Sequence, residues 1–156
     1  MSVSIFGLIF IFLSCHSETD SLSQQRSIEI KSSVQKMMDI AAKDIFYNVP
    51  LACLKYFENT PDFYMASGEQ MVFPSHDSAT KFIKELVKQI QKIELRWSNI
   101  RVDPMSNKFA NVAVIWNEDL TDFSGNQTSH SGYFSAVSEK TIQGCQLRNA
   151  HWSFTK

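Results

Sequence analysis

The chain has 156 residues, of which 44% are hydrophobic and 20% charged, and its formal net charge is −1. These values are typical of one folded globular domain with a core of its own. The near-neutral charge, with no recurring Lys/Arg stripe, excludes a nucleic-acid footprint, and three cysteines exclude a disulfide framework. Twelve Phe and three Trp indicate an aromatic core, with a dedicated ligand cavity as the alternative.

The first 14 residues are predicted to be a signal peptide. They contain no charged side chain, and residues 3–13 form an apolar run that is too short to span a bilayer. The run ends at Ser14-Cys15 and resembles a bacterial lipoprotein signal, in which cleavage before Cys15 leaves a lipidated cysteine; an ordinary secretory signal is the alternative. Either pattern predicts export. The first predicts a lipoprotein tethered to the membrane surface, on the periplasmic or cell-surface side of a bacterial membrane.

Residues 15–27 are polar and without periodicity, and they are predicted to be a linker before a domain spanning residues 28–156. From Ile28 to Phe46 apolar residues recur every three or four positions, which predicts a helix. Pro50 interrupts this pattern, so a second short helix is expected over residues 51–57. After a turn and an N-cap signal at residues 74–77, apolar positions continue to Ile93 and predict a third, long helix that closes near Trp97.

The remaining segments alternate as strands do: residues 62–67, 70–73, 95–102, 109–122, 128–138 and 145–154. The strand over residues 109–122 is apolar on both alternating faces as far as Trp116, so we expect it to be central and covered on both faces. The order of the elements predicts an α+β domain in which a curved antiparallel sheet wraps about three helices.

Four short motifs add a family resemblance. They are Thr60-Pro61-Asp62-Phe63, Glu94-Leu95-Arg96-Trp97, Leu120-Thr121-Asp122-Phe123-Ser124-Gly125 and Asn149-Ala150-His151-Trp152-Ser153. In their order and spacing the chain resembles the nuclear transport factor 2-like superfamily, specifically its SnoaL-like secreted bacterial branch, over residues 28–154. The resemblance implies a cone-shaped, cystatin-like α+β fold, a cavity between sheet and helices, and a homodimer formed through the sheet.

A hairpin model places the candidate ligand-binding residues. If Gly125-Asn126 is a two-residue turn, Glu118 pairs with Tyr133, and the two share a face with Val114 and Trp116. A slip of one residue would break this grouping. Two more residues are added, Tyr64, which follows the first family motif, and Trp97, which ends the second. The predicted ligand-binding residues are Tyr64, Trp97, Val114, Trp116, Glu118 and Tyr133.

The same strands offer candidates for acid–base catalysis. Glu118 with Tyr133 or His151 could form an acid–base pair, whereas a solvated glutamate and a structural histidine are the alternatives. The family's isomerases and cyclases carry an acid–base aspartate at the end of the first strand. Ser67 occupies that position here, and a hydroxyl cannot replace a carboxylate base.

We therefore expect a binding or interaction module for a small apolar or amphipathic ligand. The alternatives are an isomerase, dehydratase or cyclase that uses acid–base residues in the cavity, and a dimerisation module whose cavity is filled by its own aromatic rings. No cofactor is predicted, because the sequence has no Gly-rich phosphate loop. No metal site is predicted, because the four histidines lack ligand spacing. A bond between Cys53 and Cys145 remains open.

Overall fold

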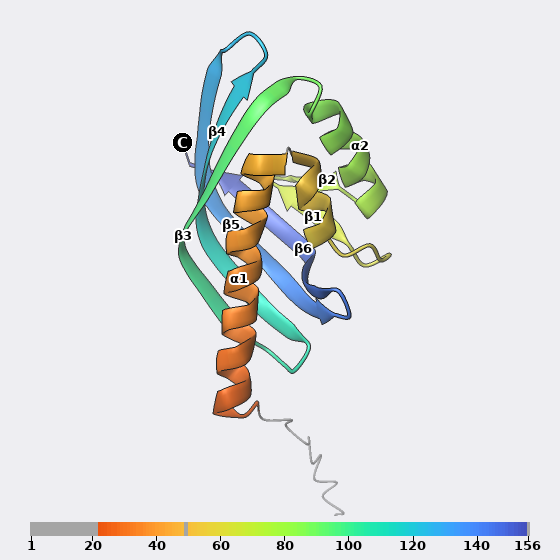
Figure 1. The fold of residues 1–156 in the computed structure, drawn as a ribbon. Coiled ribbons are helices and arrows are strands. Elements are labelled where there is room, and N and C mark those ends of the chain that lie inside the picture. Colours follow the sequence, from red (N-terminus) through yellow and green to blue (C-terminus); the bar gives the residue numbers. More distant parts are fainter. Residues whose placement is uncertain (1–21, 49, 156) are drawn as a thin grey trace, which may run out of the picture.

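The computed structural model describes residues 22–48 and 50–155, and Figure 1 shows their arrangement. The predicted signal peptide, residues 1–14, and the predicted lipidation site Cys15 lie outside the described residues. In chain order the elements are α1 (Gln24–Asn48), the 3₁₀-helix η1 (Pro50–Tyr56), β1 (Tyr64–Ser67), β2 (Gln70–Phe73), α2 (His76–Leu86), β3 (Ile90–Pro104), β4 (Phe109–Asp122), β5 (Gln127–Thr141) and β6 (Gly144–Phe154). They form an α+β domain with an open, curved, six-stranded sheet, which confirms the predicted fold class.

The first helix begins earlier than the apolar pattern predicts. Helix α1 starts at Gln24, inside the predicted linker. Ser23 explains this start, because its Oγ accepts a hydrogen bond of 3.2 Å from the backbone N–H of Arg26 and so caps the helix. An ion pair of 2.9 Å between Arg26 and Glu29 also stabilises the first turn. This turn is polar on all sides, so hydrophobic periodicity could not reveal it.

Helix α2 is shorter than predicted. It begins after the N-cap Ser75 but ends at Leu86, so the prediction of a helix continuing to Ile93 and Trp97 was wrong. Ile90 and Ile93 belong instead to β3 and pair with β4. Their spacing of three residues suits a helix face, but β-branched side chains also favour a strand, and the long pairing with β4 decides between the two.

Strand β4 is not the centre of the sheet. The strand order is β2-β1-β6-β5-β4-β3, so β4 lies second from an edge and the predicted central position was wrong. The pair β1–β6 is parallel, whereas the other neighbouring strands are antiparallel. The inward side chains of β4 are buried, with Val112 at 0% and Trp116 at 5% exposure. Ala113 and Ile115, on the outward face, are only half-buried.

The core lies between α1 and the concave face of the sheet. Val34 and Met38 of α1 are 2% and 1% exposed, and Phe63, just before β1, is 1% exposed. Figure 1 shows the helices together on this concave side. On the convex face Tyr133 is 62% exposed. Because the helices cover the concave face, a cavity between helices and sheet can form on that side.

Within the described residues, no helix combines the length and the hydropathy that crossing a membrane requires.

Cys53 and Cys145, whose pairing the sequence left open, are both free. Burial raises the pKa of the Cys53 thiol to about 12, so this thiol stays protonated.

Candidate functional site

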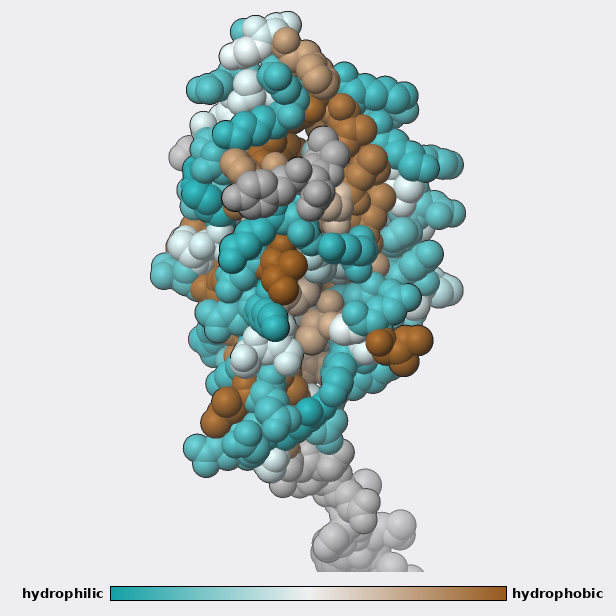
Figure 2. Space-filling view, in the orientation of Figure 1, coloured by the Kyte–Doolittle hydropathy of each residue, from teal (hydrophilic) through white to brown (hydrophobic). Residues whose placement is uncertain are grey.

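A cavity of about 360 Å³ lies between α2 and the concave face of the sheet; we call it the α2 cavity. Figure 2 shows hydrophobic residues gathered along the seam between β3 and α2, where this cavity meets solvent. Its apolar lining consists of Phe73, Phe82, Ile83, Leu86, Leu95, Trp97, Trp116, Leu120, Phe134, Trp152 and Phe154. Glu118 and His130 complete the lining and are its polar members.

The aromatic rings of the α2 cavity contact one another along its wall. The ring centroids of Trp97 and Phe134 are 5.6 Å apart, and those of Trp116 and Phe154 are 5.4 Å apart in an edge-to-face arrangement. The indole N–H of Trp97 donates a hydrogen bond of 3.1 Å to the backbone oxygen of Met38, which fixes this ring to α1. All three tryptophans of the chain line the cavity. The rings pack around the space without filling it.

Glu118 and His130 form the polar centre of the α2 cavity. They are directly paired across β4 and β5, and Glu118 Oε2 lies 3.7 Å from His130 Nδ1. Their side chains are 27% and 36% exposed. Burial raises the pKa of Glu118, although the neighbouring His130 acts in the opposite direction. A carboxylate with a raised pKa beside an imidazole, in an apolar pocket, is an arrangement suited to exchanging a proton with a ligand.

Gly132 allows the cavity wall to pack closely. A Cβ atom at this position would lie 1.7 Å from the backbone oxygen of Ser153 and 3.0 Å from the indole nitrogen of Trp116. The Trp116 indole N–H is buried and has no hydrogen-bond partner among the described residues. The ring of Trp116 can therefore lie at its place beside Glu118 because residue 132 is a glycine and has no side chain.

The predicted hairpin register was wrong, and this changes which residues share the cavity. Glu118 pairs with His130 and not with Tyr133, so β5 is shifted by three residues, an odd number that exchanges its two faces. The cause is the turn, in which residues 122–126 connect the strands in place of the predicted two-residue turn. Asp122 Oδ1 holds this longer loop by accepting hydrogen bonds from the backbone N–H groups of Ser124 and Asn126. His130 was missed because only the correct turn places it opposite Glu118.

The structure separates the other predicted site residues. Trp97 and Trp116 line the α2 cavity, and Val114 lies on the same face of β4 but in the core, at 4% exposure. Tyr133 and Tyr64 are 62% and 42% exposed and do not line the α2 cavity.

The catalytic candidate His151 lies outside this site, and so does Ser67, which occupies the position of the family's acid–base aspartate. His151 is exposed and pairs with Ser135 on the opposite face of the sheet. Ser67, at the end of β1, is half-buried and does not line the cavity either. Among the described residues, no group of His, Cys, Asp or Glu side chains could hold a metal ion.

Comparisons with known proteins show what the fold is similar to. No family model and no curated protein sequence matches the chain. A candidate scytalone dehydratase from Novosphingobium aromaticivorans has a TM-score of 0.75 and 14% identity over 86% of this chain and 89% of that chain. A nuclear transport factor 2-like superfamily protein from Salmonella enterica has a TM-score of 0.64 and 13% identity over 85% and 92%. A hexachlorocyclohexane dehydrochlorinase of type 2 has a TM-score of 0.69 and 8% identity over 86% and 90%. The chain therefore has the nuclear transport factor 2-like fold.

Proposed function

We propose that the α2 cavity binds a small, largely apolar ligand that carries one polar group, and that Glu118 and His130 position this group. The observation that carries the proposal is the Glu118–His130 pair, at 3.7 Å, in an otherwise apolar lining. The cavity volume of about 360 Å³ is within the range of small-molecule sites. Few polar groups in an apolar pocket are the usual means by which such sites orient a ligand.

The charge of the pair limits what the ligand can carry at this point. A carboxylate accepts hydrogen bonds, so Glu118 favours a ligand hydroxyl or N–H over a ligand anion. His130 offers one donor and one acceptor when neutral, which suits the same hydroxyl from its other side. We therefore expect a neutral aromatic or alicyclic alcohol or phenol, or a ketone whose oxygen accepts a hydrogen bond from His130, with its rings against the tryptophans.

A second candidate function is proton transfer to or from the bound molecule. The raised pKa of Glu118 favours it, because a base whose pKa approaches the working pH is more effective than an ordinary carboxylate. Two proteins of similar fold are described as a candidate dehydratase and a dehydrochlorinase, which are names of elimination enzymes. The separation of 3.7 Å exceeds a direct hydrogen bond, and the Glu118 side chain is 27% exposed, so a substrate proton could reach its carboxylate.

Binding is tested with 2-naphthol, read out by tryptophan fluorescence. All three tryptophans line the cavity, so a bound aromatic should change their emission directly. We expect Glu118→Gln to weaken 2-naphthol binding by about tenfold and to leave naphthalene binding unchanged, because only the hydroxyl meets the carboxylate. The matched control is Glu69→Gln, at an exposed carboxylate after Gly68. No saturable signal, or equal affinities in both variants, would contradict the proposal.

Proton transfer is tested with 2-tetralone in D₂O, by mass spectrometry of deuterium incorporation next to its carbonyl. If Glu118 removes that proton, the wild-type chain exchanges it faster than Glu118→Gln does. Binding of 2-tetralone without faster exchange would favour a pure binding function.

We also propose that the domain acts outside the cytoplasm, tethered to a membrane surface through a lipid on Cys15. The support is the sequence pattern of residues 1–15, an apolar run that ends in a small residue and Cys. Incorporation of labelled palmitate that persists in Cys15→Ala would contradict lipidation at this residue.

We propose in addition that two copies associate through the convex face of the sheet. Tyr133 and Ile115 lie side by side on this face, and Tyr133 is 62% exposed. Exposed aromatic side chains on an uncovered sheet face are typical of interaction surfaces.

A further inference from the structure

A second cavity lies between the N-terminal half of α1 and the opposite end of the sheet; we call it the α1 cavity. Its volume is about 360 Å³, and it shares no lining residue with the α2 cavity. Its floor is apolar and formed by Ile30, Val34, Met37, Tyr56 and Ala110, each 9% exposed or less. Figure 2 shows hydrophobic residues along the side of α1 that faces this end of the sheet, with hydrophilic residues around them.

A buried hydroxyl without a partner lies in the wall of the α1 cavity. Ser138 is 2% exposed, and its Oγ has no hydrogen-bond partner among the described residues. Its cross-strand neighbours on the same inward face are Ala110 and Leu147, which are apolar. An unpaired hydroxyl in such a layer is unfavourable, because it has lost its hydrogen bonds to water and gained none in the protein. An alanine would fit the fold without this penalty, so the hydroxyl is best explained by a partner that enters the cavity.

The rim of the α1 cavity is cationic. Arg26, Lys36, Lys108 and Lys140 line it, against the single carboxylate of Glu29. Arg26 is paired with Glu29, and Lys108 with Glu139 at 2.5 Å.

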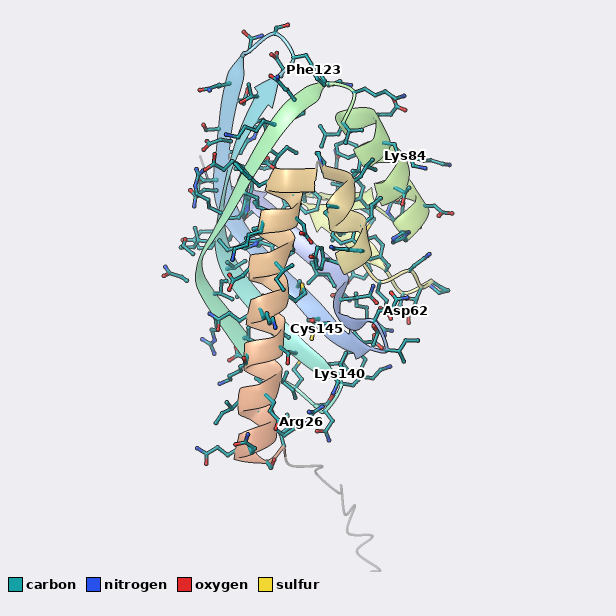
Figure 3. The ribbon with its side chains drawn as sticks, in the orientation of Figure 1. Arg26, Asp62, Lys84, Phe123, Lys140 and Cys145 are labelled. Carbon is teal, nitrogen blue, oxygen red and sulfur yellow. The ribbon has the colours of Figure 1, made fainter. Side chains whose placement is uncertain are left out.

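Two of these cations are not held in an ion pair among the described residues, although the charge of Lys140 also helps to lower the pKa of Glu29. Lys36 and Lys140 take part in none of the ion pairs within the part of the chain that the structure describes. Figure 3 shows Arg26 at the start of α1 and Lys140 at the neighbouring end of the sheet, with Cys145 between α1 and the sheet. The entrance therefore favours an anion.

From these three features we infer that the α1 cavity binds a single-chain amphipathic anion, with its hydrocarbon on the apolar floor and its carboxylate or phosphate head between Lys36 and Lys140. The head group, or a water bound to it, would also pair the Ser138 hydroxyl. The site differs in charge from the α2 cavity, where the carboxylate of Glu118 disfavours anions. The inference does not depend on the function proposed for the α2 cavity.

The test is calorimetric titration of the full-length chain with sodium decanoate below the concentration at which it forms micelles. Decyl phosphate distinguishes a phosphate head from a carboxylate, and 1-decanol measures the contribution of charge. We expect Lys36→Gln/Lys140→Gln to weaken decanoate binding by about tenfold, and Ser138→Ala to weaken it by about threefold. The matched control is Lys81→Gln/Lys84→Gln on the exposed face of α2, which removes the same charge away from the cavity.

Two further measurements place the bound molecule. None of the tryptophans lines the α1 cavity, so decanoate should bind without changing tryptophan emission and together with 2-naphthol. Ser138→Ala should unfold at an equal or higher temperature than the wild type, because it removes an unpaired buried hydroxyl. Decanoate affinities that are equal in all variants, or competition with 2-naphthol, would overturn the inference. Binding only to vesicles of anionic lipid, unaffected by Ser138→Ala, would overturn it as well.

Discussion

Glu118 and His130 face each other across the β4–β5 pair, with 3.7 Å between Glu118 Oε2 and His130 Nδ1. Both side chains belong to the lining of the α2 cavity, and the rest of that lining is apolar. The contact stabilises a charge on Glu118 only in part, because the effect of burial is the larger one and the pKa of Glu118 is raised. The site therefore holds a carboxylate in a position that opposes its ionisation, which is unfavourable for stability and favourable for acid–base function.

The first prediction follows from the sign of this shift. A carboxyl group whose folded pKa lies above its unfolded value contributes stability below the unfolded pKa, and that contribution is lost as the pH rises through the folded pKa. Glu118→Gln should therefore be more stable than the wild type at pH 8, by about 1 kcal/mol. The difference should shrink as the pH falls toward 4. Urea unfolding at the two pH values, with Glu69→Gln as the exposed control, checks this; a variant that is less stable at pH 8 would contradict it.

The second prediction concerns the close packing at Gly132. Gly132→Ala places a Cβ atom 1.7 Å from the backbone oxygen of Ser153 and 3.0 Å from the indole nitrogen of Trp116, so the β5–β6 pair must move. We expect a loss of about 3 kcal/mol or more in the free energy of unfolding, or no soluble protein. Ser135→Ala, at an exposed position of the same strand, is the control and should change stability by less than about 0.5 kcal/mol. Equal unfolding midpoints for the two variants would show that Gly132 is not required.

The sequence predicted most of the fold because local patterns decide it. Strand β4 was predicted to its observed bounds, Phe109–Asp122, since alternating apolar residues are flanked there by turn residues. The α2–β3 boundary failed because Ile90 and Ile93 are compatible with both a helix face and a strand. Pairing with Asp122 and Leu120, at the far end of β4, decides between them.

The site was less predictable because its parts are non-local. Trp116 and Glu118 were identified from one strand, but the partner of Glu118 depends on the geometry of the turn. The carboxylate of Asp122 fixes that turn through Asn126, and the pairing of Asp with an Asn four residues later was the available signal. The contributions of α2 and β6 to the cavity follow from the order of the strands, which no local pattern shows.

The third prediction concerns a buried ion-pair cluster around Glu139. This side chain is 5% exposed, and Arg148 and Lys108 contact its two carboxylate oxygens at 2.7 and 2.5 Å. Burial alone would raise the pKa of Glu139, but the two cations outweigh it and the pKa is lowered. A lowered carboxyl pKa gives stability that is present above the unfolded pKa and lost as the pH falls through the folded pKa.

Arg148→Met should therefore destabilise the chain at neutral pH by about 1–3 kcal/mol, less than for a fully broken buried pair because Lys108 remains. The effect should decrease toward pH 4, because Glu139 without Arg148 takes up a proton at a higher pH than Glu139 of the folded wild type, whose pKa is lowered. The matched control is Arg101→Met, which breaks the exposed pair with Asp103 and should change stability by at most about 1 kcal/mol. Urea unfolding between pH 8 and pH 4 measures both; a loss for Arg148→Met that does not vary with pH would contradict the prediction.

The last prediction tests the proposed association through the convex face of the sheet. Tyr133→Lys places a charge beside Ile115 on this face, and desolvating that charge in an interface is unfavourable. If two copies associate there, the wild type should show twice the mass of the chain by light scattering. The dissociation constant of the variant dimer should be higher by about tenfold or more.

Phe123→Lys is the matched control, because Phe123 is similarly exposed, at 64% compared with 62% for Tyr133, but lies in the β4–β5 turn and not on the sheet face. It should leave the mass unchanged. Since both variants exchange an exposed aromatic ring for a lysine, a difference between them reports the position of the interface and not a general loss of hydrophobic surface. A wild-type chain that stays monomeric at high concentration, or two variants that dissociate equally, would exclude this face as the site of association.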